Sequence, residues 1–496
     1  MTPDAQTTAA DSSASAQEEK SLLDQIIDEG KIGRDQEQRD ASRQQIVALI
    51  EEVMKPAAKV SKDLEATISA LIAGIDAKIS EQLNAIMHAE PFQRLEGSWR
   101  GLHYLVHQSE TSTMLKIRVM NTSKQDLYKD LDKAPEFDQS ALFKKVYEEE
   151  YGTFGGAPFG ALIGDYEFEP SPTDMDLIAK ISNVAASAHA PFLTAAHARM
   201  FGQESFTDLA NPRDLAVTFD TAKYVKWKSF RETEDSRFVG MCLPHILLRL
   251  PYGKETIPVE EFNFSEDVDG KDHKKYLWGN AAYAMGARLT NAFAKYGWCS
   301  AIRGVENGGL VEGLPAHTFN TDDGEIALKC PTELAITDRR EKELSDLGFI
   351  PLLHCKGTDY AAFFGAQSTQ KAKKYDTAAA NANARLSTQL QYLMATSRFA
   401  HYLKSIMRDK VGSPMTRKEC EDYLNRWIKN YVVSTPGVSQ EVKAKYPLSD
   451  ARVDVLEIPG KPGCYKAVAF LKPHFQLDEL TVSLRLVAEL PPPVQA

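Results

Sequence analysis

The chain has 496 residues, with 58 Lys and Arg against 69 Asp and Glu, which gives a formal net charge of −11. Phosphate contacts require a basic surface, so this charge argues against a general nucleic-acid binder and disfavours an anionic membrane surface. No apolar run approaches the roughly 18–20 residues that cross a bilayer, and residues 1–20 lack the basic start and apolar stretch of a secretory signal.

The first 60 residues divide into a leader and short helices. Residues 1–20 are rich in Ala, Ser, Thr and Gln and are predicted to be disordered. In SLLDQIIDEG (21–30), Ser21 is a candidate N-cap and Gly30 a stop signal. One face of this helix carries Leu22, Leu23, Ile26 and Ile27. A second helix is expected near residues 46–54, so we set the boundaries of the leader at 1–20 and of the N-terminal helices at 21–60.

A long amphipathic helix is predicted over residues 61–88, where apolar side chains recur at helical spacing. These side chains are Leu64, Ile68, Leu71, Ile72, Ile75, Ile79, Leu83 and Ile86. Packing is the role expected of this face. The helical pattern resumes after Pro91 around Trp99 and Leu105.

Strand-like and helical segments then alternate, which predicts an α/β domain. The expected strands are 113–121, 159–168, 191–196 and 325–337. The expected helices are 126–134, 176–190, 274–297 and 339–347, the last capped by Asp338. With the preceding long helix they form a predicted domain over 61–370.

The final part, 371–496, is predicted to be a second domain of different character. A long helix over 382–412 and another near 420–433 precede a β-hairpin over 452–471. In the last strand, ELTVSLRLVAEL (479–490), every second residue from Leu480 to Leu490 is apolar, so these side chains share one face. The whole chain is therefore expected to be a mixed α+β, multi-domain protein of the α/β class.

The Gly-rich stretch EEEYGTFGGAPFGALIGDYEF (148–168) invites a nucleotide-binding interpretation, which its spacing does not support. The chain contains neither G-x-x-x-x-G-K-[ST] nor, in this stretch, G-x-G-x-x-G. Its glycines are instead expected to provide turns and close backbone approach. The residues expected in the core are Phe154, Phe159, Ile163 and Tyr166. A second Gly-rich stretch (302–315) is interpreted as a turn-rich connection, and we expect neither ATP binding nor ATP hydrolysis.

Other catalytic or metal-binding patterns are weak. His103 and His107 share a helical face without the Glu of a zinc protease, and Cys299 has no identifiable His partner. The six cysteines are Cys242, Cys299, Cys330, Cys355, Cys420 and Cys464, and without a C-x-x-C pair they are expected to be buried, reduced thiols. No catalytic residue, cofactor or metal is predicted, so the chain is not expected to be an enzyme. Two alternatives stay open: an enzyme that uses Cys299 or a histidine, and a soluble adaptor.

Several long stretches, in order between roughly residues 60 and 491, resemble the large subunit of the type VI secretion contractile sheath, the TssC/VipB family. They are LEGSWRGLHYLV (95–106), FGALIGDYEF (159–168), CLPHILLRLPYG (242–253), WGNAAYAMGARL (278–289), YGWCSAIRGVENGGLVEGLP (296–315), PTELAITDRREKELSDLGFIPL (331–352), SRFAHYLKSIMRDKVGS (397–413) and KPHFQLDELTVSLRLVAELP (472–491). Stretches of this length are far more specific than a single short motif.

The resemblance implies a bacterial cytoplasmic protein whose C-terminal part is similar to phage tail-sheath proteins. In that family the large subunit pairs with a small sheath subunit (TssB/VipA-like) around a tube of Hcp-like rings. The sheath is anchored through a baseplate at the inner membrane and contracts to drive the tube outward. A AAA+ ATPase, ClpV, then disassembles the contracted sheath.

The resemblance and the sequence pattern together suggest three contact regions. The apolar face formed by Leu22, Leu23, Ile26 and Ile27 matches the family's ATPase-recognition helix; the alternative is a helix that packs on its own domain. The strand residues Leu480, Val482, Leu484, Leu486 and Leu490 are expected to pair with a neighbouring subunit, or with the hairpin over 452–471 of the same chain. Lys371, Lys373 and Lys374 are candidates for contact with the inner tube, or else form a solvated charged face.

Overall fold

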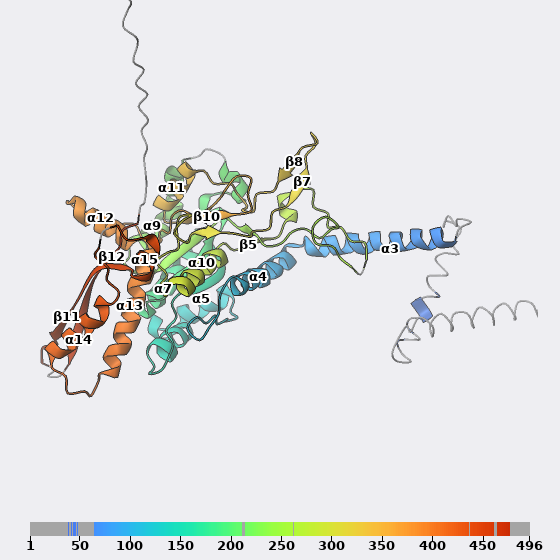
Figure 1. Ribbon diagram of the computed structural model, residues 1–496. Helices are drawn as coiled ribbons and strands as arrows, with labels where there is room; N and C mark the ends of the chain where they lie inside the picture. Colours follow the sequence, from blue (N-terminus) through green and yellow to red (C-terminus); the bar gives the residue numbers. More distant parts are fainter. Residues whose placement is uncertain are drawn as a thin grey trace, which may run out of the picture. The chain divides into compact units, whose positions relative to one another are not determined.

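A computed structural model describes residues 64–476 except 211–213, 261, 436 and 461–463, together with residues 38, 41, 43–45 and 47 (Figure 1). The predicted helix over 21–30 and the predicted strand over 479–490 lie outside the described residues. The chain divides into one unit of residues 1–83 with 259–264 and a second, larger unit of residues 84–258 with 265–496. Among the described residues, no helix is both long and apolar enough to cross a membrane.

The long helix predicted after residue 60 is present as α3, Leu64–Met87. Its apolar face, however, is exposed rather than packed. Ile68, Ile72, Ile75 and Ile79 keep between 42% and 53% of their surface accessible. The described residues therefore do not cover this face, and the expectation that it packs stays a prediction, because a helical period reports that a face is apolar and not which residues cover it. The next helix, α4 (Glu90–His107), has a proline in its first turn, where the missing N–H is tolerated.

The larger unit is built on a six-stranded sheet with the order β1-β2-β3-β9-β10-β6. These strands are β1 Leu162–Phe168, β2 Phe192–Ala196, β3 Val239–Leu243, β9 Ile350–His354, β10 Ala361–Phe363 and β6 Leu310–Val311. β1, β2, β3 and β9 pair in parallel, whereas β10 pairs antiparallel with both β9 and β6. Every residue of β2 and β3 is buried, as expected of parallel strands inside an α/β layer.

Two helices predicted from the sequence pack against this sheet. α7 (Pro172–Ala188) connects β1 to β2; it starts at the N-cap Ser171, whose side chain accepts the Asp174 N–H. α10 (Ala282–Tyr296) approaches β1 closely at Gly286, where an added Cβ would lie 2.4 Å from Cδ1 of Ile163. A side chain at this position would therefore require the Ile163 side chain to shift. The predicted helix over 274–297 begins later than expected, because residues before Ala282 form η7 and β5 instead.

The remaining elements of this part are short. The helices are α5 Lys124–Lys133, α6 Ala141–Phe143, α8 Leu215–Phe219, α9 Val225–Arg231, α11 Asp338–Asp346, the π-helix η2 Lys144–Tyr151, and the 3-10 helices η1 Phe137–Gln139, η3 Ala198–Phe201, η4 Phe206–Ala210, η5 Ala222–Tyr224, η6 Asp235–Phe238 and η7 His273–Lys275. The strands are β4 Ile246–Leu247 paired with β5 Trp278–Gly279, and β7 Thr318–Asn320 paired with β8 Ile326–Leu328.

Two predicted strands are corrected. Residues 113–121 form no strand: Leu115 and Ile117 are half-buried, but no described strand pairs with them. Of the segment 325–337 only Ile326–Leu328 is a strand of β8. In residues 113–121 the alternation of apolar and polar side chains therefore marks a half-buried segment that has no described strand partner. The N-cap of α11 is Thr337, and Asp338 is its first residue.

The Gly-rich stretch matches the sequence interpretation only in part. Gly155 adopts a left-handed φ of 78°, and a Cβ on Gly156 would lie 2.1 Å from the carbonyl oxygen of Glu150. Turns and close approach thus explain these glycines. Phe159, Ile163 and Tyr166 pack against the main core. Phe154 does not, since it is 77% exposed at the tip of the loop.

The C-terminal part contains α12 Ala378–Ser387, α13 Leu390–Asp409, α14 Arg417–Lys429, α15 Gln440–Lys445 and the hairpin β11 Leu448–Glu457 with β12 Tyr465–Pro473. The hairpin was predicted, and α14 packs against it (Figure 1). Asn425 of α14 joins the backbone of Val453 twice, donating to its carbonyl at 2.7 Å and accepting its N–H at 2.9 Å. A second apolar core, centred on Phe399 and Trp298, lies beneath this sheet.

The long helix expected over 382–412 is interrupted at Thr388 and Gln389. The break has a tertiary cause. The Thr388 carbonyl accepts the N–H of Ser368 at 2.9 Å, and the N–H of Leu390 donates to Ala366 at 2.8 Å. These backbone groups are thereby taken out of a continuous helix.

Candidate functional site

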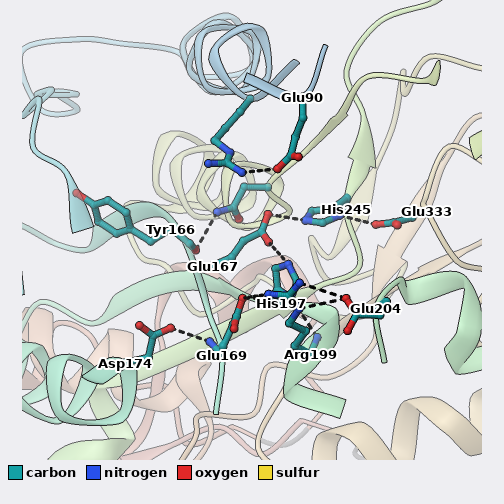
Figure 2. Close-up of polar contacts among 12 residues, drawn as sticks. Glu90, Tyr166, Glu167, Glu169, Asp174, His197, Arg199, Glu204, His245 and Glu333 are labelled. Carbon is teal, nitrogen blue, oxygen red and sulfur yellow. Dashed lines mark hydrogen bonds and ion pairs between the residues drawn. The ribbon is translucent and has the colours of Figure 1, made fainter. Parts of the chain in front are cut away.

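His245, directly after β3, lies between two glutamates (Figure 2). Its Nε2 is 2.8 Å from Oε1 of Glu167 on β1, and its Nδ1 contacts Oε2 of Glu333. Both ring nitrogens donate to carboxylates only when the imidazole is doubly protonated. Burial opposes this charge, but the two carboxylates outweigh burial and hold the pKa of His245 well above its usual value.

Glu333 depends on this cation. Burial alone would raise its pKa, but the charge of His245 and the hydrogen bond to it lower the pKa of Glu333 to about 2. His273 adds to the effect, with Nε2 at 3.2 Å from Oε1 of Glu333. The buried carboxylate is therefore ionised throughout the physiological range.

The network extends toward the surface through His197, as Figure 2 shows. His197 Nε2 lies 3.7 Å from Glu167, and its Nδ1 lies 3.8 Å from Glu169. Arg199 approaches the same Glu169 at 3.4 Å. These residues tie the end of β1 to the segments that follow β2 and β3, so the network acts as an ionic brace at the carboxyl ends of the parallel strands.

A second brace stands at Arg249. Its guanidinium, 4% exposed, meets Glu266, 0% exposed, at 2.6 Å and Glu96 of α4 at 2.8 Å. Removing Arg249 would leave two nearby carboxylates, one of them fully buried, without the cation that they share. Both braces fix segments relative to each other, and neither has the makeup of a reaction centre.

The catalytic candidates receive no support. The Cys299 Sγ donates to the Leu289 carbonyl at 3.6 Å, and burial raises the pKa of its thiol to about 12. A protonated thiol is a poor nucleophile. His103 and His107 are exposed and stack on each other at 3.7 Å between ring centroids. Within the described ranges, no three His, Cys, Asp or Glu side chains form a group that could hold a metal.

All six cysteines are free thiols, but only Cys242 is fully buried, and Cys299, Cys330 and Cys420 are partly buried. Cys355 and Cys464 are exposed, contrary to expectation. Each lies in a connection to a strand, where the small apolar side chain has no core to enter.

Only one of the three predicted contact regions lies among the described residues. Leu22, Leu23, Ile26 and Ile27 fall outside them, as do Leu480, Val482, Leu484, Leu486 and Leu490. Lys371, Lys373 and Lys374 are all exposed and precede α12, a helix without a buried residue. Lys373 forms an ion pair with Glu234, and the Lys371 N–H donates to the Arg231 carbonyl at 2.9 Å. Their segment is thus attached to the larger unit while the ammonium groups of Lys371 and Lys374 point to no described carboxylate.

One edge of strand β12 has no partner among the described residues. Among the described strands it pairs only with β11, over a register from Leu448↔Pro473 to Glu457↔Tyr465. The unpaired N–H and C=O groups on its other side can accept a further strand.

Comparison with known proteins covers nearly the whole chain. The VipB family model (EvpB/VC_A0108, tail sheath N-terminal domain) matches residues 69–370, and the VipB_2 model (tail sheath gpW/gp25-like domain) matches residues 379–490. The type VI secretion system sheath protein TssC1 of Pseudomonas aeruginosa is 53% identical over 456 residues, which cover 91% of this chain and 92% of that protein. The chain belongs to the TssC/VipB family of type VI secretion sheath proteins. It is therefore a structural sheath protein, of a family that assembles into a helical sheath with copies of itself and a partner subunit.

Among solved structures, two of the anti-feeding prophage are similar to this TssC/VipB chain. Its baseplate matches with a TM-score of 0.36 and 9% identity, over 75% of this chain and 83% of that one. Its contracted helical sheath matches with a TM-score of 0.31 and 10% identity, over 76% and 99%. Likenesses this distant carry no argument about individual residues.

The braces were missed by the sequence analysis, although several of their residues lie in the stretches that carry the TssC/VipB resemblance. His245 and Arg249 both belong to CLPHILLRLPYG, and Glu333 belongs to PTELAIT. The available signal was a titratable or charged residue inside an otherwise apolar run, which requires a buried partner. Nothing in the sequence indicated which carboxylates would supply it.

We expect His245→Gln to lower the free energy of unfolding by about 1.5–3 kcal/mol, the range for hydrogen bonds to charged groups. The raised pKa of His245 contributes stability that is fully present below about pH 6.5 and is lost as pH rises through the folded value. The depressed pKa of Glu333 contributes stability that is present above about pH 4.5 and is lost as the pH falls toward about 2. Urea unfolding at several pH values measures both.

His103→Gln, at an exposed histidine outside the network, is the matched control. The brace interpretation requires that the difference between His245→Gln and wild type shrink as pH rises above 6.5 toward the folded pKa. Identical unfolding profiles for the two variants would contradict it.

Proposed function

We propose that this chain is the large, non-catalytic subunit of a type VI contractile sheath. It pairs with a small sheath subunit (TssB/VipA-like) around an Hcp-like tube, and contraction propels tube and effectors out of the cell. The assembly works in the bacterial cytoplasm, anchored through a baseplate at the inner membrane. The observation that supports this most is the 53% identity to TssC1 over 91% of the chain.

The same proposal assigns four parts: a leader over 1–20, N-terminal helices over 21–60, a first sheath domain over 61–370 and a second over 371–496. The matched family domains, 69–370 and 379–490, are compatible with the last two. The exposed isoleucine face of α3 favours a partner that brings its own apolar surface, such as an amphipathic helix of the small subunit.

Contraction without catalysis needs stored free energy. We infer that the extended sheath is metastable and that contraction replaces one set of intersubunit contacts with a more favourable set. The protonated Cys299 thiol and the lack of a phosphate-loop sequence agree with a protein that does not turn over ATP. A few kcal/mol per subunit suffices when many subunits move together, since about 1.4 kcal/mol already changes an equilibrium tenfold.

The terminal strand over 479–490 is proposed to pair with a neighbouring subunit. The open edge of β12 supports such strand addition. Deleting residues 480–496 should leave a soluble heterodimer with the small subunit that forms no tubules in electron microscopy. Deleting only 494–496, beyond the prolines at 491–493, should leave assembly intact. Stable sheaths from the longer truncation would remove this strand from the interface.

The segment 21–30 is proposed as the recognition helix for the ATPase ClpV. It is shorter than the roughly 12–15 residues of a stable isolated helix, so binding in a partner groove would order it. Leu23→Asp with Ile26→Asp should preserve assembly and contraction but leave contracted sheaths accumulating. Gln25→Asp, which adds a charge beside the apolar face, is the control. Normal recycling in the double variant would refute the assignment.

Lys371, Lys373 and Lys374 are proposed to face the inner tube. Their exposure supports this, while the ion pair of Lys373 with Glu234 leaves two of the three ammonium groups available to an acidic partner. Changing all three to Glu should impair tube-dependent assembly, whereas changing all three to Arg keeps the charge and should not. Normal firing by the Glu variant would show that the segment is solvated.

A further inference from the structure

A pocket of about 330 Å³ lies between the Gly-rich loop and one face of α13. α13 contributes Arg398, His401, Tyr402 and Arg408, which recur at helical spacing and so share a face. The loop contributes a wall that runs from Glu150 to Pro158. This volume is at the low end of the ~300–1,000 Å³ typical of ligand sites.

Arg398 is a cation without an anion. Among the described residues its guanidinium has no hydrogen-bond or carboxylate partner; it stacks over Tyr402 at 4.7 Å and Phe293 at 5.9 Å. Its Nε is buried and unsatisfied. A guanidinium presents five donors, and buried donors of this kind normally meet an acceptor.

The neighbouring cations leave the pocket positive. Lys404 lies over the Tyr151 ring at 3.5 Å and donates to the Tyr147 hydroxyl at 3.2 Å, with no described carboxylate beside it. Arg408 donates at 2.8 Å to the carbonyls of Tyr151 and Thr153, which holds the Gly-rich loop over the pocket. Of the two acids in the lining, Glu150 is engaged by Arg118 and by the Ala157 N–H, and Asp409 is exposed.

His401 supplies a second unsatisfied atom. Its Nε2 donates to the Ala188 carbonyl at 2.8 Å, so its Nδ1 carries a lone pair, and this buried atom has no partner among the described residues. The side chain is 4% exposed, and burial lowers its pKa to about 4, with Arg398 and Lys404 adding to the effect. A neutral His401 therefore offers an acceptor next to the donors of Arg398.

We propose that this pocket binds one oxyanion, whose oxygens accept from Arg398 and Lys404 while a hydroxyl or N–H beside them donates to His401. Guanidinium groups match the planar and tetrahedral oxygens of carboxylate and phosphate. Two sources present this chemistry: a free oxyanion such as hydrogen phosphate, and an acidic side chain with its backbone N–H from a neighbouring sheath subunit. The second source rests on the proposed sheath function, and the first does not.

The test uses the full chain co-purified with the small sheath subunit, or the chain alone if no pair forms. Inorganic phosphate is titrated at constant ionic strength while the thermal unfolding midpoint is followed. If a free oxyanion binds, the midpoint rises saturably, Arg398→Gln weakens the apparent affinity about ten- to hundredfold, and Arg452→Gln, at an exposed arginine, leaves it unchanged. If a neighbour supplies the group, phosphate has no saturable effect, but Arg398→Gln reduces sheath assembly and Arg452→Gln does not.

The thermal unfolding midpoint measured without phosphate is the control for correct folding of the variants. Arg398→Gln removes an unpaired cation, so the unfolding midpoint of this variant should equal or exceed that of wild type. Arg398→Lys keeps the charge and should retain part of the phosphate affinity or sheath assembly that the Gln variant loses. A lowered midpoint, or neither a phosphate effect nor an assembly defect, overturns the proposal. Failure of the wild-type chain to form sheaths would instead refute the proposed function. The phosphate titration would still show whether the pocket binds a free oxyanion.

Discussion

The pairing of the His245 imidazolium with Glu167 and Glu333 is the interaction on which the arrangement of the larger unit depends. Glu333 is almost fully buried and remains ionised only because the cation stands beside it. An ionised carboxylate without such a partner would be costly in that environment. Because Glu167 ends β1 and His245 follows β3, the charges also fix where these parallel strands stop relative to the loop before α11.

Rigid subunits suit a sheath that changes shape by rearranging its contacts. The main core packs against the β1–β2–β3–β9 strands, and the second core packs under β11 and β12. Packed interiors transmit strain and resist deformation, so motion is directed to the surfaces between subunits. The exposed face of α3 and the edge of β12 that has no described partner are surfaces of this kind, and the ion pairs of His245 and Arg249 hold segments of the larger unit in place.

Local pattern predicted those elements whose stability is local. α7 and β2 were predicted from the local sequence pattern, and the hairpin from its alternation. The prediction for α7 began at residue 176 and did not include the N-cap Ser171. The break at Thr388 was missed because the segment around Ala366 and Ser368, more than a dozen residues away, takes its backbone groups. The apolar face of α3 was predicted from its period, but the residues that cover it were not, since a period carries no information about what packs against the face.

For the site residues too, the sequence showed the local stretches but not the tertiary contacts between them. The resemblance quoted the stretches that contain His245, Arg249 and Glu333, yet their pairing depends on strand order, which no spacing revealed. The orphaned Arg398 was equally invisible, because only the packing of α13 against the Gly-rich loop shows that it has no described anion.

Assembly without nucleotide tests the central claim most directly. The chain is co-expressed with the small sheath subunit and treated with apyrase to remove nucleotide. Apyrase and divalent metal are then removed by gel filtration in EDTA, and the sample is examined by electron microscopy. Our account predicts hollow helical tubules whose number does not change when ATP is restored. Monodisperse small particles, or tubules that form only with ATP, would contradict it.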